Sequence, residues 1–244
     1  MQWSSFRNVY WRRAALWSAV LLLSTGMRAA RAQVTLGQID TFEDGTTQGW
    51  TVGAGGAPGP VNIATGGPAG AGDNFLEVSS TGRPGPGGRL VTINSSQWAG
   101  NYLAAGVNEI TLDANNLGAT DLSIRLLFAD PMGGPPADVA VTSQALLLPA
   151  GSGWVHASFL IDPADLVAVL GSASAALANA TEMRIFHNPA PDFPGPPVGI
   201  PDIAATLGVD NITAAAVPEP GAFALLGGLA VPGVTLLLRR RRQG

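Results

Sequence analysis

The sequence predicts an all-β domain built as a β-sandwich with one short helix, flanked by a separate segment at each end of the chain. Within residues 33–216, short runs alternate between apolar and polar residues, which is the pattern of a strand with one buried face. The 32 glycines and 19 prolines cluster between these runs, as turn residues do. A region of this length can bury about 70% of its unfolded surface as one domain.

The expected strands follow one another along the domain. They cover residues 39–42, 49–52, 61–64, 75–79, 89–93, 107–113, 121–128, 139–148, 154–161, 182–187 and 208–213. In the strand that begins at Asp121, every second side chain is apolar, which turns Arg125 outward. The same alternation turns Trp154 and His156 away from the core. Many short strands joined by glycine and proline turns favour a sandwich.

One helix is expected, over residues 164–170. Asp162 can cap its first turn, Pro163 suits its first position, and Gly171 can end it. The small apolar residues of 172–180 could extend it.

The N-terminal segment, residues 1–32, has the parts of a secretory signal peptide. Three arginines precede an apolar run over residues 14–26. That run is short for a membrane span, which needs about 20 residues. Ala30 and Ala32 supply small residues before the expected cut, which would leave Gln33 as the mature N-terminus. An uncleaved membrane anchor is the alternative.

The C-terminal segment, residues 217–244, has three parts in a fixed order. Pro218-Glu219-Pro220 comes first, an uncharged stretch over residues 221–238 follows, and four arginines close it. At 1.5 Å per residue the stretch would form a helix of about 27 Å, close to the thickness of a bilayer core. The arginines should stay in the cytoplasm, so the domain would face outward.

This order of parts resembles the PEP-CTERM protein-sorting signal of Gram-negative bacteria. The resemblance implies export across the inner membrane, anchoring by the 221–238 transmembrane helix, and cleavage by an exosortase near the motif. It also implies a cell-surface or extracellular-matrix location in bacteria that make extracellular polysaccharide. A plain C-terminal anchor would have the same topology without the processing.

Charge and composition exclude several functions. The chain has no cysteine, which excludes disulfides, a thiolate nucleophile and cysteine-ligated metals. Every basic residue is an arginine, and only four arginines accompany the 17 acidic residues between positions 33 and 238. Such an acidic body disfavours nucleic acid as a partner and suits divalent cations or neutral polar ligands.

Two short motifs resemble the first and last strands of jelly-roll carbohydrate-binding modules. They are residues 40–45 (DTFEDG), with Gly49-Trp50 after them, and residues 207–212 (LGVDNI). The resemblance implies a jelly-roll-like sandwich whose two chain ends lie side by side and share a structural calcium. Asp40, Glu43 and Asp210 could supply carboxylates to Ca²⁺, which takes six to eight oxygen ligands. The alternative is that these acids are ordinary exposed turn residues.

A glycan-binding site would need exposed aromatic rings with polar neighbours. Trp154, His156 and Arg125 meet this condition by strand alternation, and Trp98 and Tyr102 flank a glycine in a segment expected to be a loop or an edge. The alternative is ordinary packing, because large aromatic side chains are mostly buried.

The sequence favours a non-catalytic function. No G-x-S-x-G motif surrounds Ser152 or Ser158, although Ser158 shares a face with His156. The preferred interpretation is an exported, surface-retained protein of the polysaccharide matrix, or an adhesion protein, that binds an extracellular glycan. The alternatives are a secreted hydrolase acting on polysaccharide or its ester substituents, and a structural coat protein without a specific ligand.

Overall fold

The computed structural model describes residues 33–53, 58–85, 87–131, 134–192 and 201–217. The predicted signal peptide, the Pro218-Glu219-Pro220 motif and the apolar stretch after it lie outside these residues. Within the described ranges, no helix is both long enough and apolar enough to cross a membrane.

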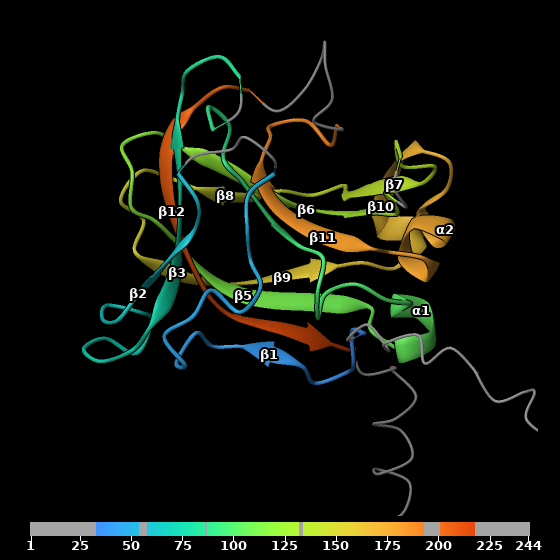
Figure 1. Ribbon diagram of the computed structural model, residues 1–244, viewed down its shortest axis with the longest axis horizontal. Helices are drawn as coiled ribbons and strands as arrows, with labels where there is room; N and C mark the ends of the chain where they lie inside the picture. Colours follow the sequence, from blue (N-terminus) through green and yellow to red (C-terminus); the bar gives the residue numbers. More distant parts are fainter. Residues whose placement is uncertain (1–32, 54–57, 86, 132–133, 193–200, 218–244) are drawn as a thin grey trace, which may run out of the picture. The chain divides into compact units, whose positions relative to one another are not determined.

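The described residues form two antiparallel sheets packed face to face, which confirms the predicted all-β sandwich (Figure 1). In order across sheet A, the strands are β2 (Val61–Ile63), β3 (Phe75–Thr81), β12 (Ala204–Ala215), β5 (Glu109–Asn116) and β9 (Trp154–Leu160), with β1 (Ile39–Asp40) paired to β12. In order across sheet B, they are β10 (Leu166–Leu170), β7 (Val139–Thr142), β6 (Leu122–Ala129), β11 (Glu182–His187) and β4 (Val91–Asn94), with β8 (Leu146–Leu148) paired to β6.

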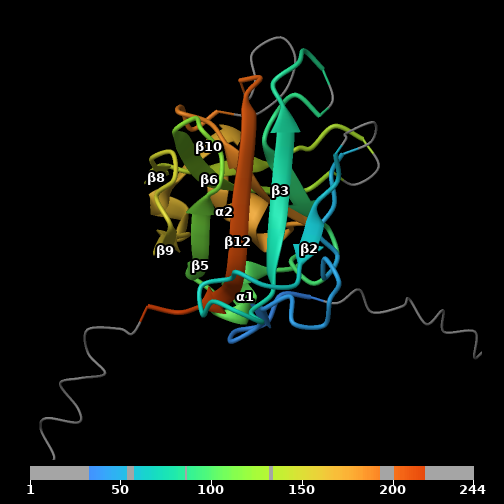
Figure 2. The ribbon, with the colours of Figure 1, turned by 90° about the vertical axis from the view of Figure 1, so that its left-hand side faces the viewer.

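The two ends of the domain lie side by side, as the jelly-roll resemblance implied. Strand β1 pairs with β12 in a register that sets Ile39 opposite Thr213 and Asp40 opposite Ile212. Figure 2 looks onto sheet A and shows β12 running between β3 and β5. The last strand is therefore central in its sheet. Asp40, from the opening motif, pairs directly with it.

Two short helices stand at one end of the sandwich (Figure 1). Helix α1 (Tyr102–Ala105) is capped by Asn101, whose side chain accepts a hydrogen bond from the Ala104 N–H. Helix α2 (Ala173–Ala178) is capped by Ser172 in the same way.

The predicted helix over residues 164–170 is wrong. Pro163–Asp165 form a single 3₁₀ turn, and Leu166–Leu170 form strand β10, which pairs with β7. Valine alternates with alanine and leucine there, and β-branched residues lose more side-chain freedom in a helix than in a strand. The helix lies instead in the small apolar segment that follows, as α2.

Two predicted strands also differ from the structure. Residues 49–52 make only an isolated bridge, from Thr51 to Ile93. Gln48 and Gly49 take left-handed backbone conformations there, and these interrupt an extended strand. Residues 139–148 are split into β7 and β8, because the chain leaves the sheet after Thr142.

The main core lies between the sheets, and a second apolar cluster lies on the other face of sheet B. In β6, Ile124 and Phe128 face the main core, while Leu127 faces the second cluster with Val141 and Phe186. All of these side chains are buried. The outer face of sheet B therefore carries a buried apolar cluster, whereas strand β9 of sheet A alternates core residues with exposed polar ones.

Candidate functional site

Strand β9 presents a row of side chains on the outer face of sheet A. Trp154, His156 and Ser158 alternate with core residues, as the sequence predicted. In the register with β5, Asn115 lies opposite Trp154 and Asp113 lies opposite His156. We call these five residues the β9 face.

Trp154 is half-buried and held in one orientation. Its Nε1 donates a hydrogen bond of 2.9 Å to the carbonyl of Gly66, and its ring meets the Phe75 ring edge-on at 5.3 Å. A Cβ at Gly208 would lie 3.0 Å from the Trp154 Cη2 atom and 3.3 Å from the Phe75 ring. A glycine in β12 therefore leaves room for the indole to reach across β5, and the ring is a fixed, partly exposed platform.

His156 is exposed and is oriented by a carboxylate. Its Nδ1 lies 2.8 Å from Asp113 Oδ1, and Asp113 Oδ2 accepts a 2.8 Å hydrogen bond from the side chain of Asn211. Asn211 has a left-handed backbone, and the register of β12 with β5 shifts between Asp210 and Thr213. This bulge aims the Asn211 amide at Asp113, as bulges commonly do beside binding sites.

A group of carboxylates lies beside the β9 face on the same sheet. Asp210 is only 1% exposed, and burial raises its pKa to about 7, with the negative charges of Asp73, Asp113 and Glu43 adding to the shift. Its Oδ1 accepts a hydrogen bond of 2.7 Å from the backbone N–H of Asn211. The predicted neighbours Glu43 and Asp210 are thus electrostatically coupled, and Asp73 joins them from the loop before β3.

Asp40, the third predicted calcium ligand, has a different role. Its Oδ2 accepts hydrogen bonds from the indole nitrogens of Trp98 at 2.6 Å and Trp50 at 2.8 Å, and Gln97 also donates to the carboxylate. Burial raises the pKa of Asp40, and these donors oppose the rise. Its oxygens face N–H donors in the core, so the prediction that it shares a cation with Asp210 is wrong.

Trp98 and Tyr102 are fully buried, contrary to their predicted place in a ligand site. The Tyr102 hydroxyl donates to the Trp98 carbonyl at 2.7 Å, and its ring packs edge-on against Phe128. The Gly100 N–H donates to the Ala180 carbonyl, which draws the segment inward. Both aromatic side chains satisfy their polar atoms inside the domain, so neither is available to a sugar.

Arg125 is also unavailable to a ligand. It lies on the outer face of sheet B, as alternation predicted, but it is only 5% exposed. Its guanidinium donates to the carbonyls of Thr142, Ser143, Asn188 and Pro189 at 2.8–2.9 Å. Burial lowers its pKa. The side chain therefore ties the segment after β7 to the segment after β11.

The negative charge of the clustered carboxylates Glu43, Asp73 and Asp210 suits a divalent cation. Their side chains alone do not supply a complete set of ligands. Among the described residues, no three histidine, aspartate or glutamate side chains gather closely enough to hold one metal ion. Glu43 Oε1 accepts a hydrogen bond from the Asn74 N–H, and the Phe42 carbonyl faces the Asn62 and Asn74 amides. Glu43 and Asp210 would therefore need backbone or amide oxygens to complete a calcium shell.

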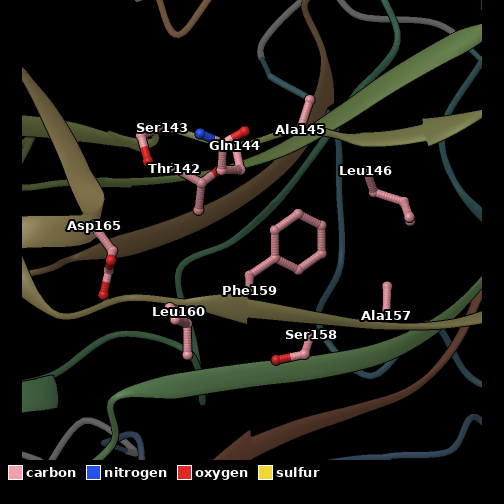
Figure 3. Close-up of a pocket in the computed structure, with 10 residues that line it drawn as sticks. All are labelled: Thr142, Ser143, Gln144, Ala145, Leu146, Ala157, Ser158, Phe159, Leu160 and Asp165. Atoms are coloured by element: carbon pink, nitrogen blue, oxygen red, sulfur yellow. The ribbon is translucent and has the colours of Figure 1, made fainter.

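A pocket of about 330 Å³ opens at the edge of the sandwich, between β9 and the segment that joins β7 to β8 (Figure 3). We call it the edge pocket. Its lining residues are Thr142, Ser143, Gln144, Ala145, Leu146, Ala157, Ser158, Phe159, Leu160 and Asp165. The Phe159 ring stands in the middle of this lining (Figure 3). Sequence reasoning missed the pocket because it treated residues 139–148 as one continuous strand.

No protein-family model and no curated protein matches this chain. Among solved structures, it is similar to a family 11 carbohydrate-binding module from Clostridium thermocellum in complex with a β-1,3-1,4-mixed-linked tetrasaccharide. The TM-score is 0.50 at 16% identity, over 76% of this chain and 99% of that one. A family 11 module of a cellulosomal cellulase from the same organism gives 0.50 at 14% identity, over 76% and 98% of the two chains.

The chain is also similar to part of an exo-β-agarase, with a TM-score of 0.51 at 12% identity. That match covers 76% of this chain and 26% of the agarase chain. At these identities the similarity establishes the fold. The domain is a jelly-roll sandwich of the kind seen in carbohydrate-binding modules.

Proposed function

We propose that this chain is a non-catalytic glycan-binding protein and that the β9 face binds the glycan. The observation that carries the proposal is the Trp154 indole, which is fixed by Gly66 and Phe75 and remains partly exposed on a polar face. A sugar ring can stack on a pre-oriented aromatic ring with little loss of side-chain freedom on binding.

The neighbours of Trp154 supply hydrogen-bonding groups that suit sugar hydroxyls. The His156 imidazole is held by Asp113, and the Ser158 hydroxyl is hydrogen-bonded to Glu109. Imidazole, carboxylate and hydroxyl groups together offer donors and acceptors along the paired strands β9 and β5. The nearby acidic group would repel polyanions at low salt, so the favoured glycans are neutral.

The fold comparison supports a glycan partner. Two similar structures are carbohydrate-binding modules, and one of them was solved with a tetrasaccharide. The geometry also favours binding over catalysis, since the Ser158 hydroxyl donates to Glu109 and not to the imidazole of His156, which a Ser–His–Asp triad requires.

The proposal includes a location and a route. The terminal motifs support export with cleavage near Gln33, anchoring through residues 221–238, and exosortase processing near Pro218-Glu219-Pro220 before display at the cell surface or in the matrix. N-terminal sequencing should find Gln33 or a close neighbour first. Deleting residues 217–244 should convert a retained protein into a released one, and unchanged fractionation would contradict the sorting role.

We also propose a structural calcium bound by Glu43 and Asp210, with Asp73 close by and backbone oxygens completing the shell. The coupled carboxylates and the buried Asp210 support it. The ion would reduce their mutual repulsion and tie the opening segment to β12. Asp40 is not part of this site.

Affinity electrophoresis of the full-length protein in gels containing neutral polysaccharides, such as mixed-linked β-glucan or agarose, tests the glycan site. Trp154→Ala should weaken binding roughly ten-fold or more, as expected for loss of a central aromatic contact. Leu147→Ala is the control, because Leu147 is exposed on sheet B. Equal retardation of Trp154→Ala and the parent protein would overturn the assignment of the β9 face.

A further inference from the structure

The edge pocket adjoins the β9 face along strand β9. Ser158 belongs to both, and His156 lies two residues before it on the same strand. At about 3.3 Å per residue, the two positions are about 7 Å apart along β9. A glycan bound over Trp154 and His156 would therefore reach the mouth of the pocket.

The walls of the edge pocket are mainly apolar. Phe159 and Leu146 supply large carbon surfaces, and Ala145 and Ala157 leave space between them. The Phe159 ring projects from β9 toward the opposite wall (Figure 3). Sugar hydroxyls gain little binding free energy from contact with such walls. A methyl or other small alkyl group gains binding free energy there because its apolar surface leaves water.

The polar residues of the lining are Thr142, Ser143, Gln144, Ser158 and Asp165. Gln144 can donate and accept, Ser158 has a hydroxyl, and Asp165 is the one charged residue among those that line the pocket. A carboxylate at this position disfavours sugars that carry carboxylate, sulfate or phosphate groups. A neutral substituent with one polar end and one apolar end matches the arrangement.

The pocket is pre-formed rather than loose. The Ser143 N–H donates to the Asp165 carbonyl at 3.0 Å, and Arg125 donates to the Ser143 carbonyl at 2.9 Å. These bonds fix the segment between β7 and β8 from two sides. The volume of about 330 Å³ lies near the lower end of the range for small-molecule sites, about 300–1,000 Å³, so it suits one sugar unit or its substituent.

We propose that the edge pocket recognises an acyl substituent, such as an acetyl group, on a neutral glycan bound along the β9 face. The methyl end would pack against Phe159, and the carbonyl oxygen would accept a hydrogen bond from the side-chain amide of Gln144. This inference rests on the proposed function of the β9 face and adds the class of glycan: acylated and uncharged.

The test compares one polysaccharide before and after mild alkaline deacetylation, using partially acetylated glucomannan and the full-length protein. The parent should bind the acetylated form roughly ten-fold tighter, the scale of discrimination that one small apolar group provides in a pocket. Ala145→Leu should fill the half-buried rim and remove the preference while binding to the deacetylated polymer remains. Ala150→Leu makes the same change at an exposed position outside the lining and should keep the preference.

A second measurement does not depend on any substitution. In the complex with acetylated glucomannan oligosaccharides, NMR should show a nuclear Overhauser effect between the acetyl methyl protons and the Phe159 ring protons. Equal affinity for both polymers, or a preference that Ala145→Leu leaves intact, would overturn the pocket assignment while the β9 face stands. No binding to either polymer would overturn the β9 face and the pocket assignment together.

Discussion

The indole nitrogen of Trp98 lies 2.6 Å from Oδ2 of Asp40, inside the core of the domain. The same oxygen accepts a hydrogen bond from Trp50, whose ring centre is 6.4 Å from that of Trp98. One buried carboxylate therefore satisfies two buried indoles. The opening motif around Asp40 anchors the first strand to the core through these hydrogen bonds.

Replacing Asp40 tests this anchoring role. Asp40→Ala leaves two buried indole N–H groups without an acceptor, which should reduce the free energy of unfolding by about 2–6 kcal/mol, at roughly 1–3 kcal/mol for each unsatisfied group. Asp40→Asn keeps an acceptor oxygen and should cost less. Urea denaturation followed by tryptophan fluorescence measures both. An alanine variant as stable as the parent would contradict the anchoring role.

Gly208 is predicted to control the orientation of Trp154. Gly208→Val adds side-chain atoms where even a Cβ would lie 3.0 Å from the indole, so the ring must shift. Binding to neutral polysaccharide should weaken several-fold in affinity electrophoresis. Gly118→Val is not a suitable control, because a Cβ there would lie 3.1 Å from the Thr206 backbone nitrogen. Thr206→Val, a near-isosteric change in the same strand, should leave the affinity unchanged.

His187 is predicted to make stability depend on pH. The Ser123 N–H donates to its Nδ1 at 2.9 Å, which requires the neutral ring, and burial lowers the pKa of His187 below the usual 6.5. A lowered pKa gives stability that is present above pH 6.5 and is lost as the pH falls below it. The difference in unfolding free energy between the parent and His187→Gln should therefore shrink from pH 7.5 to pH 5.5. A constant difference would show that His187 keeps its ordinary pKa.

The strand pattern and the outward direction of the β9 side chains could be predicted from the sequence, because alternation reports directly which face of a strand a residue occupies. Trp154 and His156 were found in this way. The same pattern placed Arg125 outward but could not show that loops at Thr142 and Asn188 cover it. Alternation reports a direction, whereas exposure depends on segments that pack from elsewhere in the chain.

The errors at Asp40, Trp98 and Tyr102 have a related cause. Sequence proximity placed Asp40 with Glu43, yet in the structure the Asp40 carboxylate accepts hydrogen bonds from the core indoles while Glu43 is among the acids coupled to Asp210. The glycine between Trp98 and Tyr102 suggested a loop or an edge, yet the polar atoms of both side chains are satisfied in the core, by Asp40 for Trp98 and by the Trp98 carbonyl for Tyr102. Long-range hydrogen bonds of this kind leave no periodic signal in a sequence.

Calcium is predicted to stabilise the domain through Asp210 and not through Asp40. With chelator, the raised pKa of Asp210, about 7, means that its ionised form costs stability as the pH rises from the unfolded value of 3.8 through 7. Asp210→Asn should remove that cost, so at pH 8 the metal-free variant should melt at a higher temperature than the metal-free parent.

Added Ca²⁺ at one hundred times its dissociation constant should add about 2.7 kcal/mol to the unfolding free energy of the parent. It should leave Asp210→Asn nearly unchanged, while Asp40→Asn keeps the full response. Differential scanning calorimetry at pH 8 with Ca²⁺ or chelator measures all three proteins, and a parent whose melting temperature ignores calcium would exclude the site.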